Sequence, residues 1–402
     1  MSVGDGPGER SRVLVTGAAG FIGGHVRRAL AAAGHEVVAV DSMWEDVHGA
    51  DAEPPQGVSV VDVRDADALA ELLPGIDVVC HLAGAGPGAV AAEAVEPHRM
   101  PGADLMRGAS VFVAHNDAAT ATLLAAMERA GVRRLVLASS VAVYGEGRYR
   151  GMRGGVFHPG MRRRRDLDRG MFDHRAPRTG DLLTWEPVGE DAPVRPRSAY
   201  AASKVAQENY ALAWAAQPGV SATVLRYHHV YGDPVCPVRT AEAGVVARFR
   251  AELAAGRAPH IFEDGGQTRD FVHVRDVAAA TVAAVRQHLP GFVPLNIASG
   301  RPVTVWQVAS LLAKALGGPE PVVTGRYRAT DIRHLVANPE RARRALDFTP
   351  RIPPARASPP TPPAPNPDRS PRRRWHPVSV RCATGFPLGV RLRAWMIRCG
   401  SR

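Results

Sequence analysis

The 402-residue sequence has few cysteines, no long apolar run and, in its last segment, few acidic residues. Each of these absences excludes a class of protein or of partner. The chain has only four cysteines, Cys80, Cys236, Cys382 and Cys399, which lie too far apart for a disulfide framework or a zinc site. We therefore expect no bound metal and a reducing, cytoplasmic setting. No apolar run is long enough for a transmembrane helix, and residues 1–10 are polar and glycine-rich, unlike a signal peptide. We expect no membrane partner.

Acidic residues are scarce in one segment, and this explains the basic balance of the chain. The formal net charge is +11. Residues 351–402 hold eleven arginines, no lysine and a single acid, Asp368, and so carry +10 of that charge. Because the rest of the chain is nearly neutral, the basicity belongs to the tail, and no nucleic-acid partner is expected.

The tail is also short of apolar residues. Residues 353–377 contain ten prolines, so this segment cannot bury enough surface to fold. We expect residues 1–11 and 351–402 to be disordered. The composition of the tail fits either a shifted reading frame in a GC-rich gene or a dispensable extension. The remainder is long enough for one large or two ordinary domains, since 45% of the chain is apolar.

The folded part begins with an apolar run at residues 12–15, a glycine-rich turn and a helical pattern over about residues 21–33. Strand, glycine turn and helix is the order of a dinucleotide-binding site. Gly17 permits the tight turn, Gly20 lets the backbone approach a pyrophosphate, and Gly23 lets the helix pack close to the strand. The free N–H groups of the helix N-terminus would then bind the phosphates.

An acidic residue completes this pattern. Asp41 ends the next apolar run, residues 36–40, and lies 18 residues after Gly23. A carboxylate there accepts hydrogen bonds from the adenosine ribose and repels a 2′-phosphate. Ser42 and Met43 follow, with no arginine for such a phosphate, so we predict NAD rather than NADP. The alternative is an ordinary turn residue at the end of a strand.

Further apolar runs at residues 58–61, 77–81, 132–138 and 221–226 alternate with helical patterns. This alternation predicts an α/β fold with a doubly wound parallel sheet. Small residues follow the run that ends at His81, and they would let the backbone pass close to a cofactor. His81 itself is either a ligand or a core histidine, and we favour the second.

Two segments carry the candidate chemistry. Tyr200 and Lys204 are four residues apart in a helical pattern, so they share one helix face. An ammonium beside a phenol lowers the phenol pKa from its usual value of about 10. Ser140, at the end of a strand, can hold the same substrate oxygen. The set could remove the proton of a secondary alcohol while hydride leaves its carbon. A surface Tyr and Lys on an ordinary amphipathic helix is the alternative.

Taken in order, these motifs resemble the extended short-chain dehydrogenase/reductase family, the NAD-dependent sugar-nucleotide epimerases and dehydratases. Members like dTDP-L-rhamnose 4-epimerase and UDP-glucose 4-epimerase are the most similar. The resemblance covers about residues 12–350. It implies a Rossmann NAD-binding domain at residues 12–225 and a smaller α/β substrate-binding part at residues 226–350. It also implies a homodimer.

The resemblance further assigns roles to residues. Tyr200 would be the catalytic base, Lys204 would bind the nicotinamide ribose and lower the pKa of Tyr200, and Ser140 would bind the sugar hydroxyl. The implied NAD-binding residues are Gly17, Gly20, Phe21, Ile22, Gly23, Asp41, Asp62, Val63, Leu82, Ala83, Asn116, Tyr200 and Lys204. The implied substrate-binding residues are Ser140, His229, Arg269 and Arg333.

The sequence departs from the family pattern in two places. Residues 146–195 form an inserted loop, which in rhamnose-epimerase-like members often carries cysteines that suggest a metal knuckle. Here no cysteine lies between Cys80 and Cys236, so we predict no metal. The basic run at residues 162–165 is either a phosphate contact or, as we favour, a solvated loop face. His229 stands where the family usually has an asparagine that contacts the sugar phosphate, whereas Arg269 matches the diphosphate-binding arginine.

Together these features predict a NAD-dependent nucleotide-sugar 4-epimerase of deoxysugar biosynthesis, which works through a transient 4-keto sugar. A 4,6-dehydratase is disfavoured. Family dehydratases place Asp-Glu after this Ser/Thr, whereas the chain has Val141 and Ala142, which cannot move protons. Two alternatives stay open: a reductase of 4-keto-6-deoxysugars, and a catalytically weak NAD-binding member of the family.

Overall fold

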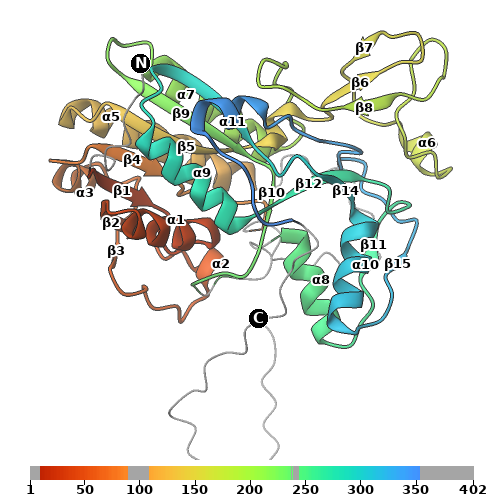
Figure 1. The fold of residues 1–402 in the computed structure, drawn as a ribbon, viewed down its shortest axis with the longest axis horizontal. Coiled ribbons are helices and arrows are strands. Elements are labelled where there is room, and N and C mark those ends of the chain that lie inside the picture. Colours follow the sequence, from red (N-terminus) through yellow and green to blue (C-terminus); the bar gives the residue numbers. More distant parts are fainter. Residues whose placement is uncertain (1–9, 89–107, 237, 239–243, 354–402) are drawn as a thin grey trace, which may run out of the picture. The chain divides into compact units, whose positions relative to one another are not determined.

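The computed structural model describes residues 10–88, 108–236, 238 and 244–353. A seven-stranded sheet runs through them in the order β13-β9-β5-β4-β1-β2-β3, with every neighbouring pair parallel (Figure 1). This confirms the predicted doubly wound α/β fold. The strands are β1 (Arg12–Thr16), β2 (Glu36–Asp41), β3 (Val58–Val60), β4 (Val78–His81), β5 (Arg134–Ser140), β9 (Ser221–Tyr227) and β13 (Gly291–Ile297).

Helices cover both faces of this sheet, because successive residues of a buried strand point to opposite sides. Val13 and Val15 of β1 belong to the apolar core of one face, and Leu14 belongs to the core of the other; all three are completely buried. The helices of the first face are α1 (Phe21–Ala32), α9 (Val274–Arg286) and α11 (Glu340–Leu346). Those of the second face are α3 (Ala66–Leu72), α5 (Ala119–Ala130) and α7 (Ala199–Trp214).

Strand β13 shows that the large sheet uses residues from beyond position 226. It pairs with β9 along its whole length, from Gly291 opposite Ser221 to Ile297 opposite Tyr227. The large sheet therefore contains residues from both sides of the domain boundary that we expected between residues 225 and 226.

The remaining C-terminal elements form a separate apolar core around Phe249, Phe271 and Leu312. One three-stranded sheet has the order β10-β12-β14, and a two-stranded sheet joins β11 to β15. These elements are α8 (Gly244–Ala254), α10 (Val305–Leu316), β10 (His229–Tyr231), β11 (His260–Ile261), β12 (Thr268–His273), β14 (Pro302–Thr304) and β15 (Val322–Val323).

The inserted loop at residues 146–195 contains a small antiparallel sheet, β7-β6-β8, with Tyr149 completely buried at its centre. Its elements are β6 (Arg148–Arg150), β7 (Val156–Phe157), β8 (Thr184–Glu186) and the short helix α6 (Arg164–Leu167). Within the described ranges, no group of three or more His, Cys, Asp or Glu side chains is placed to hold a metal ion. Nor is any described helix long and apolar enough to cross a membrane.

Candidate active site

A tight glycine turn joins β1 to α1, and it leaves no room for side chains. Gly17 has φ +69°, and a Cβ atom there would lie 2.7 Å from the backbone nitrogen of Ala83. A Cβ atom on Gly23 would lie only 1.9 Å from the carbonyl oxygen of Gly17. Only glycine fits at these two positions. The end of β1, the start of α1 and the loop after β4 therefore meet at one point.

Helix α1 begins without a capping side chain. Its N-cap residue is Gly20, and its first turn contains no acidic residue. The first N–H group that bonds within the helix is that of Gly24, which donates to the carbonyl of Gly20 at 3.0 Å. The N–H groups of Phe21, Ile22 and Gly23 come before it, so they can receive an anion. The Phe21 side chain is buried and that of Ile22 packs against the core. These two predicted cofactor residues therefore offer a ligand their backbone rather than their side chains.

Asp41, at the end of β2, holds the glycine turn in place. One carboxylate oxygen accepts a hydrogen bond from the backbone of Ala19 at 2.9 Å, and the other accepts from Met43 at 3.0 Å. The ring of His48 lies 3.4 Å from the same group. Burial raises the pKa of Asp41, but the His48 and backbone hydrogen bonds outweigh burial and bring the pKa below its ordinary value. The carboxylate is therefore ionised at neutral pH.

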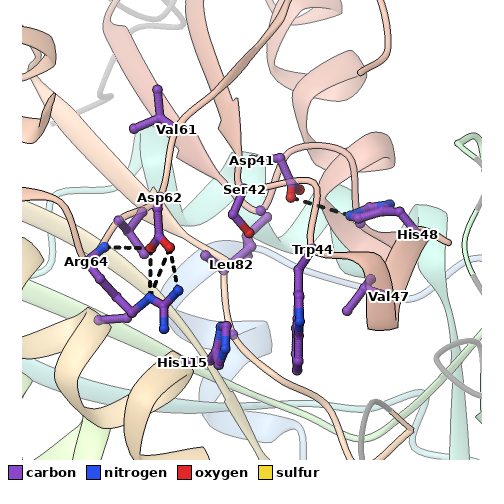
Figure 2. Close-up of a pocket in the computed structure, with 16 residues that line it drawn as sticks. Asp41, Ser42, Trp44, Val47, His48, Val61, Asp62, Arg64, Leu82 and His115 are labelled. Carbon is purple, nitrogen blue, oxygen red and sulfur yellow. Dashed lines mark hydrogen bonds and ion pairs between the residues drawn. The ribbon is translucent and has the colours of Figure 1, made fainter. Parts of the chain in front are cut away.

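A pocket opens beside Asp41, and Figure 2 shows the side chains that surround it. It brings together seven of the predicted cofactor residues: Gly17, Gly20, Asp41, Asp62, Val63, Leu82 and Ala83. Asp62 is held by a two-pronged ion pair with Arg64, at 2.6 Å for the shorter contact. Across the pocket, the rings of Trp44 and His115 stack with centroids 4.1 Å apart and an interplanar angle of 12°. Sequence reasoning missed this stack, because neither position carries a motif.

Asn116 ties the loop after β4 to helix α7. It lies in the π-helix η1 (Val113–Ala118) that precedes α5. Its side-chain oxygen accepts from the backbone of Ala85 at 2.7 Å, and its amide nitrogen donates to Ser203 at 2.8 Å. A Cβ atom on Gly84 would lie 2.7 Å from this side chain and 3.8 Å from the Lys204 ammonium. Asn116 thus positions the backbone between the dinucleotide turn and the predicted catalytic helix.

His81 is a core histidine, as the sequence favoured. It is 1% exposed, and its two ring nitrogens lie 2.8 Å from the hydroxyl of Thr16 and 3.0 Å from that of Thr120. Burial, with a smaller contribution from the Lys204 charge, lowers the pKa of His81 to about 3. The ring is therefore neutral and joins β4 to β1 and α5.

The predicted catalytic residues lie at the end of β5 and on the first turns of α7. Ser198 caps α7 by accepting a hydrogen bond from Ala201, so the helix begins just before Tyr200. Lys204 is buried and donates to the carbonyl of Ala138 in β5 at 3.1 Å. Ser140 ends the same strand, two residues later. The helix and the strand end that carry the three groups are thereby joined directly.

Lys204 is buried away from water, and the Tyr200 ring packs against an apolar cluster of Ala85, Phe112 and Ala199. Burial lowers the pKa of Lys204 to about 8, although Glu208 and Asp117 act in the opposite direction. Tyr200 lies one helical turn before Lys204, and its ring packs edge-to-face against Phe112 with centroids 5.7 Å apart. Such an environment strengthens electrostatic effects of the ammonium on a neighbouring phenol.

Of the predicted substrate-binding residues, His229 and Arg269 lie in adjacent strands. His229 begins β10, and its ring packs against Phe271 of β12. Arg269 in β12 donates to the carbonyl oxygens of Thr268, at 2.8 Å, and of Ile332. Burial lowers the pKa of Arg269. These acceptors are neutral, and within the part of the chain that the structure describes no carboxylate is hydrogen-bonded to the Arg269 guanidinium.

Arg333 occupies a different environment. Its guanidinium donates to Asp173, at 2.7 Å, to Glu263, at 2.9 Å, and to Asp264, at 2.7 Å. These donors are held by protein carboxylates, which is the arrangement of a structural arginine. Arg162 of the inserted loop joins the same cluster through Glu263 at 2.6 Å.

The four arginines at residues 162–165 therefore differ in their exposure to solvent. Arg163, Arg164 and Arg165 are exposed, which agrees with a solvated face. The same interpretation is wrong for Arg162, which is buried and paired with an acid that lies 101 residues later in the chain.

The sequence matches the NAD dependent epimerase/dehydratase family over residues 13–152 and 179–298. The dTDP-L-rhamnose 4-epimerase of Burkholderia thailandensis is 32% identical over 336 residues, which cover 81% of this chain and 87% of that protein. The UDP-glucose 4-epimerase of Azospirillum brasilense is 31% identical over 360 residues, 85% of this chain and 87% of that protein.

Solved structures agree with these sequence matches. MoeE5 in complex with UDP-glucuronic acid and NAD has a TM-score of 0.64 at 30% identity, and the alignment covers 86% of this chain and 96% of that one. The UDP-glucose 4-epimerase of Thermotoga maritima with UDP-glucose has a TM-score of 0.66 at 26% identity, with the same coverage of the two chains, 86% and 96%.

Proposed function

The chain belongs to the NAD-dependent epimerase/dehydratase family, and on that premise we propose that it interconverts two nucleotide sugars that differ in configuration at carbon 4. The observation that supports the proposal most is the hydrogen bond from Lys204 to the carbonyl of Ala138 in β5. Ala138 lies two residues before Ser140, and Lys204 lies one helical turn after Tyr200. Relatives that cover most of the chain and are at least 30% identical to it are named dTDP-L-rhamnose and UDP-glucose 4-epimerases.

NAD is the cofactor, and the geometry of the glycine turn fits it. Gly17 and Gly23 have no room for a Cβ atom, the N-terminus of α1 has no capping side chain, and the ionised Asp41 would accept a hydrogen bond from a ribose hydroxyl. When bound, NAD supplies a hydride acceptor that can return the same hydride. The chain's own residues must then bind the sugar, remove a proton and return it.

Tyr200 would move that proton. As phenolate, it takes the proton of the carbon-4 hydroxyl as the alcohol is oxidised, and it gives a proton back when the ketone is reduced. Lys204 would favour the phenolate by its charge and bind the nicotinamide ribose. Ser140 would hold the sugar oxygen in place. Because the proton and the hydride both return, the reaction has no net redox change.

The residues that follow β5 do not favour the elimination of water from a sugar. Loss of hydroxide from carbon 6 requires an acid beside the sugar, since hydroxide is a poor leaving group. The residues that follow Ser140 are Val141 and Ala142, in the short 3₁₀ helix η2 (Val141–Tyr144). Neither can donate or accept a proton, so the 4-keto sugar should survive until hydride returns. This supports an epimerase over a dehydratase.

The proposal includes a nucleotide-sugar substrate, a cytoplasmic setting, no nucleic-acid partner and a homodimer. The charge distribution supports the third point, since most of the excess positive charge lies in residues 351–402. Two apolar side chains on α7, Tyr210 and Leu212, are 45% and 50% exposed and would suit an interface between two copies. Sedimentation equilibrium of the purified protein distinguishes a dimer from a monomer.

The test is turnover without added cofactor. Purified protein is incubated with UDP-glucose, UDP-galactose, dTDP-L-rhamnose and related nucleotide sugars, and the products are separated by chromatography. We expect a second epimer to form from one of them in the absence of added NAD or NADH. Tyr200→Phe should bind NAD normally and lose activity by on the order of 100- to 10,000-fold. A stoichiometric demand for NADH would favour a reductase instead.

A further inference from the structure

The inserted loop contains a cavity of its own, of about 470 Å³, which is lined by residues of β7, of α6 and of the two segments 158–163 and 171–183. The loop is found in Figure 1 by the labels β6, β7, β8 and α6. No described residue lines both this cavity and the pocket beside Asp41. Pockets that bind small organic molecules measure roughly 300–1,000 Å³. The cavity is therefore large enough for a ligand, and the charges around it indicate which kind.

Two of the charged side chains in the lining are already neutralised. Arg162 pairs with Glu263 at 2.6 Å, and both side chains are buried. Asp173 pairs with Arg333 at 2.7 Å, and its carboxylate also lies 3.2 Å from the ring of His334. These ion pairs join the inserted loop to the C-terminal part of the chain and leave no net charge for a ligand.

The two histidines of the lining are also engaged with the loop itself. Nδ1 of His158 lies 3.0 Å from the carbonyl oxygen of Gly147. Nε2 of His174 lies 2.9 Å from the carboxylate of Glu146, and both of these side chains are buried. Neither ring adds a free positive charge to the cavity.

The charged side chains that remain are three arginines and one acid. Arg165 lies 3.7 Å from the carboxylate of Asp166, and Arg175 donates to the carbonyl of Gly180. Among the described residues Arg163 forms no ion pair. The three arginines are exposed, so solvent or an anion can reach them. Three positive charges against one negative charge leave a net charge of +2 for a ligand.

Arg162 adds an unused hydrogen-bond donor. Its Nη atoms donate to the carbonyls of Phe172 and Asp331 as well as to Glu263. In the described part of the chain no acceptor is bonded to its Nε–H group, although the side chain is buried. Buried donors without an acceptor are rare in native structures. An oxygen of a ligand in the cavity, or a water that the ligand holds, can complete this group.

The rest of the lining is largely apolar. It includes the side chains of Phe157, Met161, Met171 and Leu183. Met161 is 45% exposed, which is unusual for so large an apolar side chain. A ligand that fits this cavity therefore needs an anionic group for the arginines and an organic body that packs on these side chains.

From this lining we propose that the inserted loop holds a second ligand site, separate from the pocket beside Asp41, and that its ligand is a phosphate monoester of a small organic molecule. A monoester has a charge of roughly −1.5 to −2 at pH 7, which matches the net charge of +2. Ionised phosphate oxygens accept hydrogen bonds and guanidinium groups only donate them, often in pairs. The proposal does not depend on the reaction that the chain catalyses.

The first experiment uses the full-length protein with saturating NAD, so that the phosphate-binding groups of the glycine turn are occupied. Glucose 1-phosphate is titrated into it in a calorimeter. Arg163→Gln and Arg175→Gln each remove one charge from the cavity and should each weaken the affinity by about 5- to 50-fold. Arg178→Gln is the matched control, because Arg178 is an exposed arginine of the same loop that does not line this cavity. Its affinity should equal that of wild type.

Three results would overturn the site. They are the absence of binding to wild-type protein, binding that neither Arg163→Gln nor Arg175→Gln weakens, and an equal loss of affinity in Arg178→Gln. Because all three arginines are exposed, the replacements should leave the melting temperature unchanged. A loss of affinity at an unchanged melting temperature is then not a loss of fold.

The second experiment identifies the ligand class. Inorganic phosphate should bind more weakly than glucose 1-phosphate, because it has no body to pack on the apolar side chains, and equal affinities would overturn the organic part of the proposal. UDP-glucose separates the two sources of a phosphate group. It should not displace glucose 1-phosphate, and displacement would replace the monoester by the diphosphate of a nucleotide sugar. None of these measurements involves turnover, so their outcome is independent of the proposed epimerase activity.

Discussion

Replacing Lys204 by methionine should abolish turnover and, below about pH 8, stabilise the cofactor-free protein. The Lys204 ammonium is buried, and among the described residues it makes one hydrogen bond, to the carbonyl of Ala138. The acid one turn later, Glu208, is bound by two nitrogens of Arg226, at 2.6 and 3.0 Å. Lys204 forms no salt bridge within the described residues, and Glu208 and Asp117 offset the desolvation of its charge only in part.

The magnitude follows from the pKa. Burial lowers the pKa of Lys204 from 10.5 to about 8, which corresponds to about 3 kcal/mol. Below about pH 8 the lysine is charged in both folded and unfolded chains, so the buried charge lowers the free energy of unfolding by the full amount. As the pH rises from 8 toward 10.5, the folded protein has lost the proton and the unfolded chain still binds it. Stability due to Lys204 therefore increases over this range.

The assay is urea-induced unfolding of wild-type protein and Lys204→Met, both without NAD, at pH 7 and pH 10. The difference in unfolding free energy between the two proteins should shift by about 2–3 kcal/mol in favour of wild type at the higher pH. Lost packing and the lost bond to Ala138 affect both pH values similarly and cancel. A difference that does not change with pH would refute the reasoning.

Three other predictions concern the turn, the tail and the product. Gly23→Ala should weaken NAD binding on the order of 100-fold or more in calorimetry, because its Cβ atom would lie 1.9 Å from a backbone oxygen. The control Gly189→Ala, whose Cβ atom would have nothing within 4 Å, should bind NAD normally. Equal affinities of the two variants for NAD would contradict the steric explanation. Truncation after Pro353 should preserve activity and melting temperature, whereas truncation after Arg351 removes a backbone N–H that binds Asp276 at 2.9 Å and should lower the melting temperature. Mass spectrometry should find products with the mass of the substrate, and a product lighter by one water would count against an epimerase.

The parts of the site that the sequence predicts are those whose geometry is local. Gly17 lies in the turn after β1, Gly23 lies in the first turn of α1, and the spacing to Asp41 spans one strand–helix–strand unit, so residue order alone places them together. Tyr200 and Lys204 share a helix face for the same reason. The small residues after β4 also have a reason in the structure, since a Cβ atom on Gly84 would lie 2.7 Å from the Asn116 side chain and 3.8 Å from the Lys204 ammonium.

The parts that the sequence does not predict depend on distant partners. The resemblance predicts that Arg333 contacts the nucleotide, whereas in the structure its guanidinium donates to Asp173 and Glu263, which lie 160 and 70 residues away. The Trp44–His115 stack joins a loop after β2 to the π-helix before α5. No spacing rule connects such pairs, because their proximity is a result of the completed fold.

The central claim is that a hydride leaves carbon 4 of a nucleotide sugar and returns to it within one active site. The most direct test uses a nucleotide sugar with deuterium at carbon 4, incubated with wild-type protein in ordinary water that contains added unlabelled NADH. Both epimers should keep their deuterium at carbon 4, and none should enter water or the free cofactor. Loss of the label to water, or its replacement by hydrogen from added NADH, would contradict the claim.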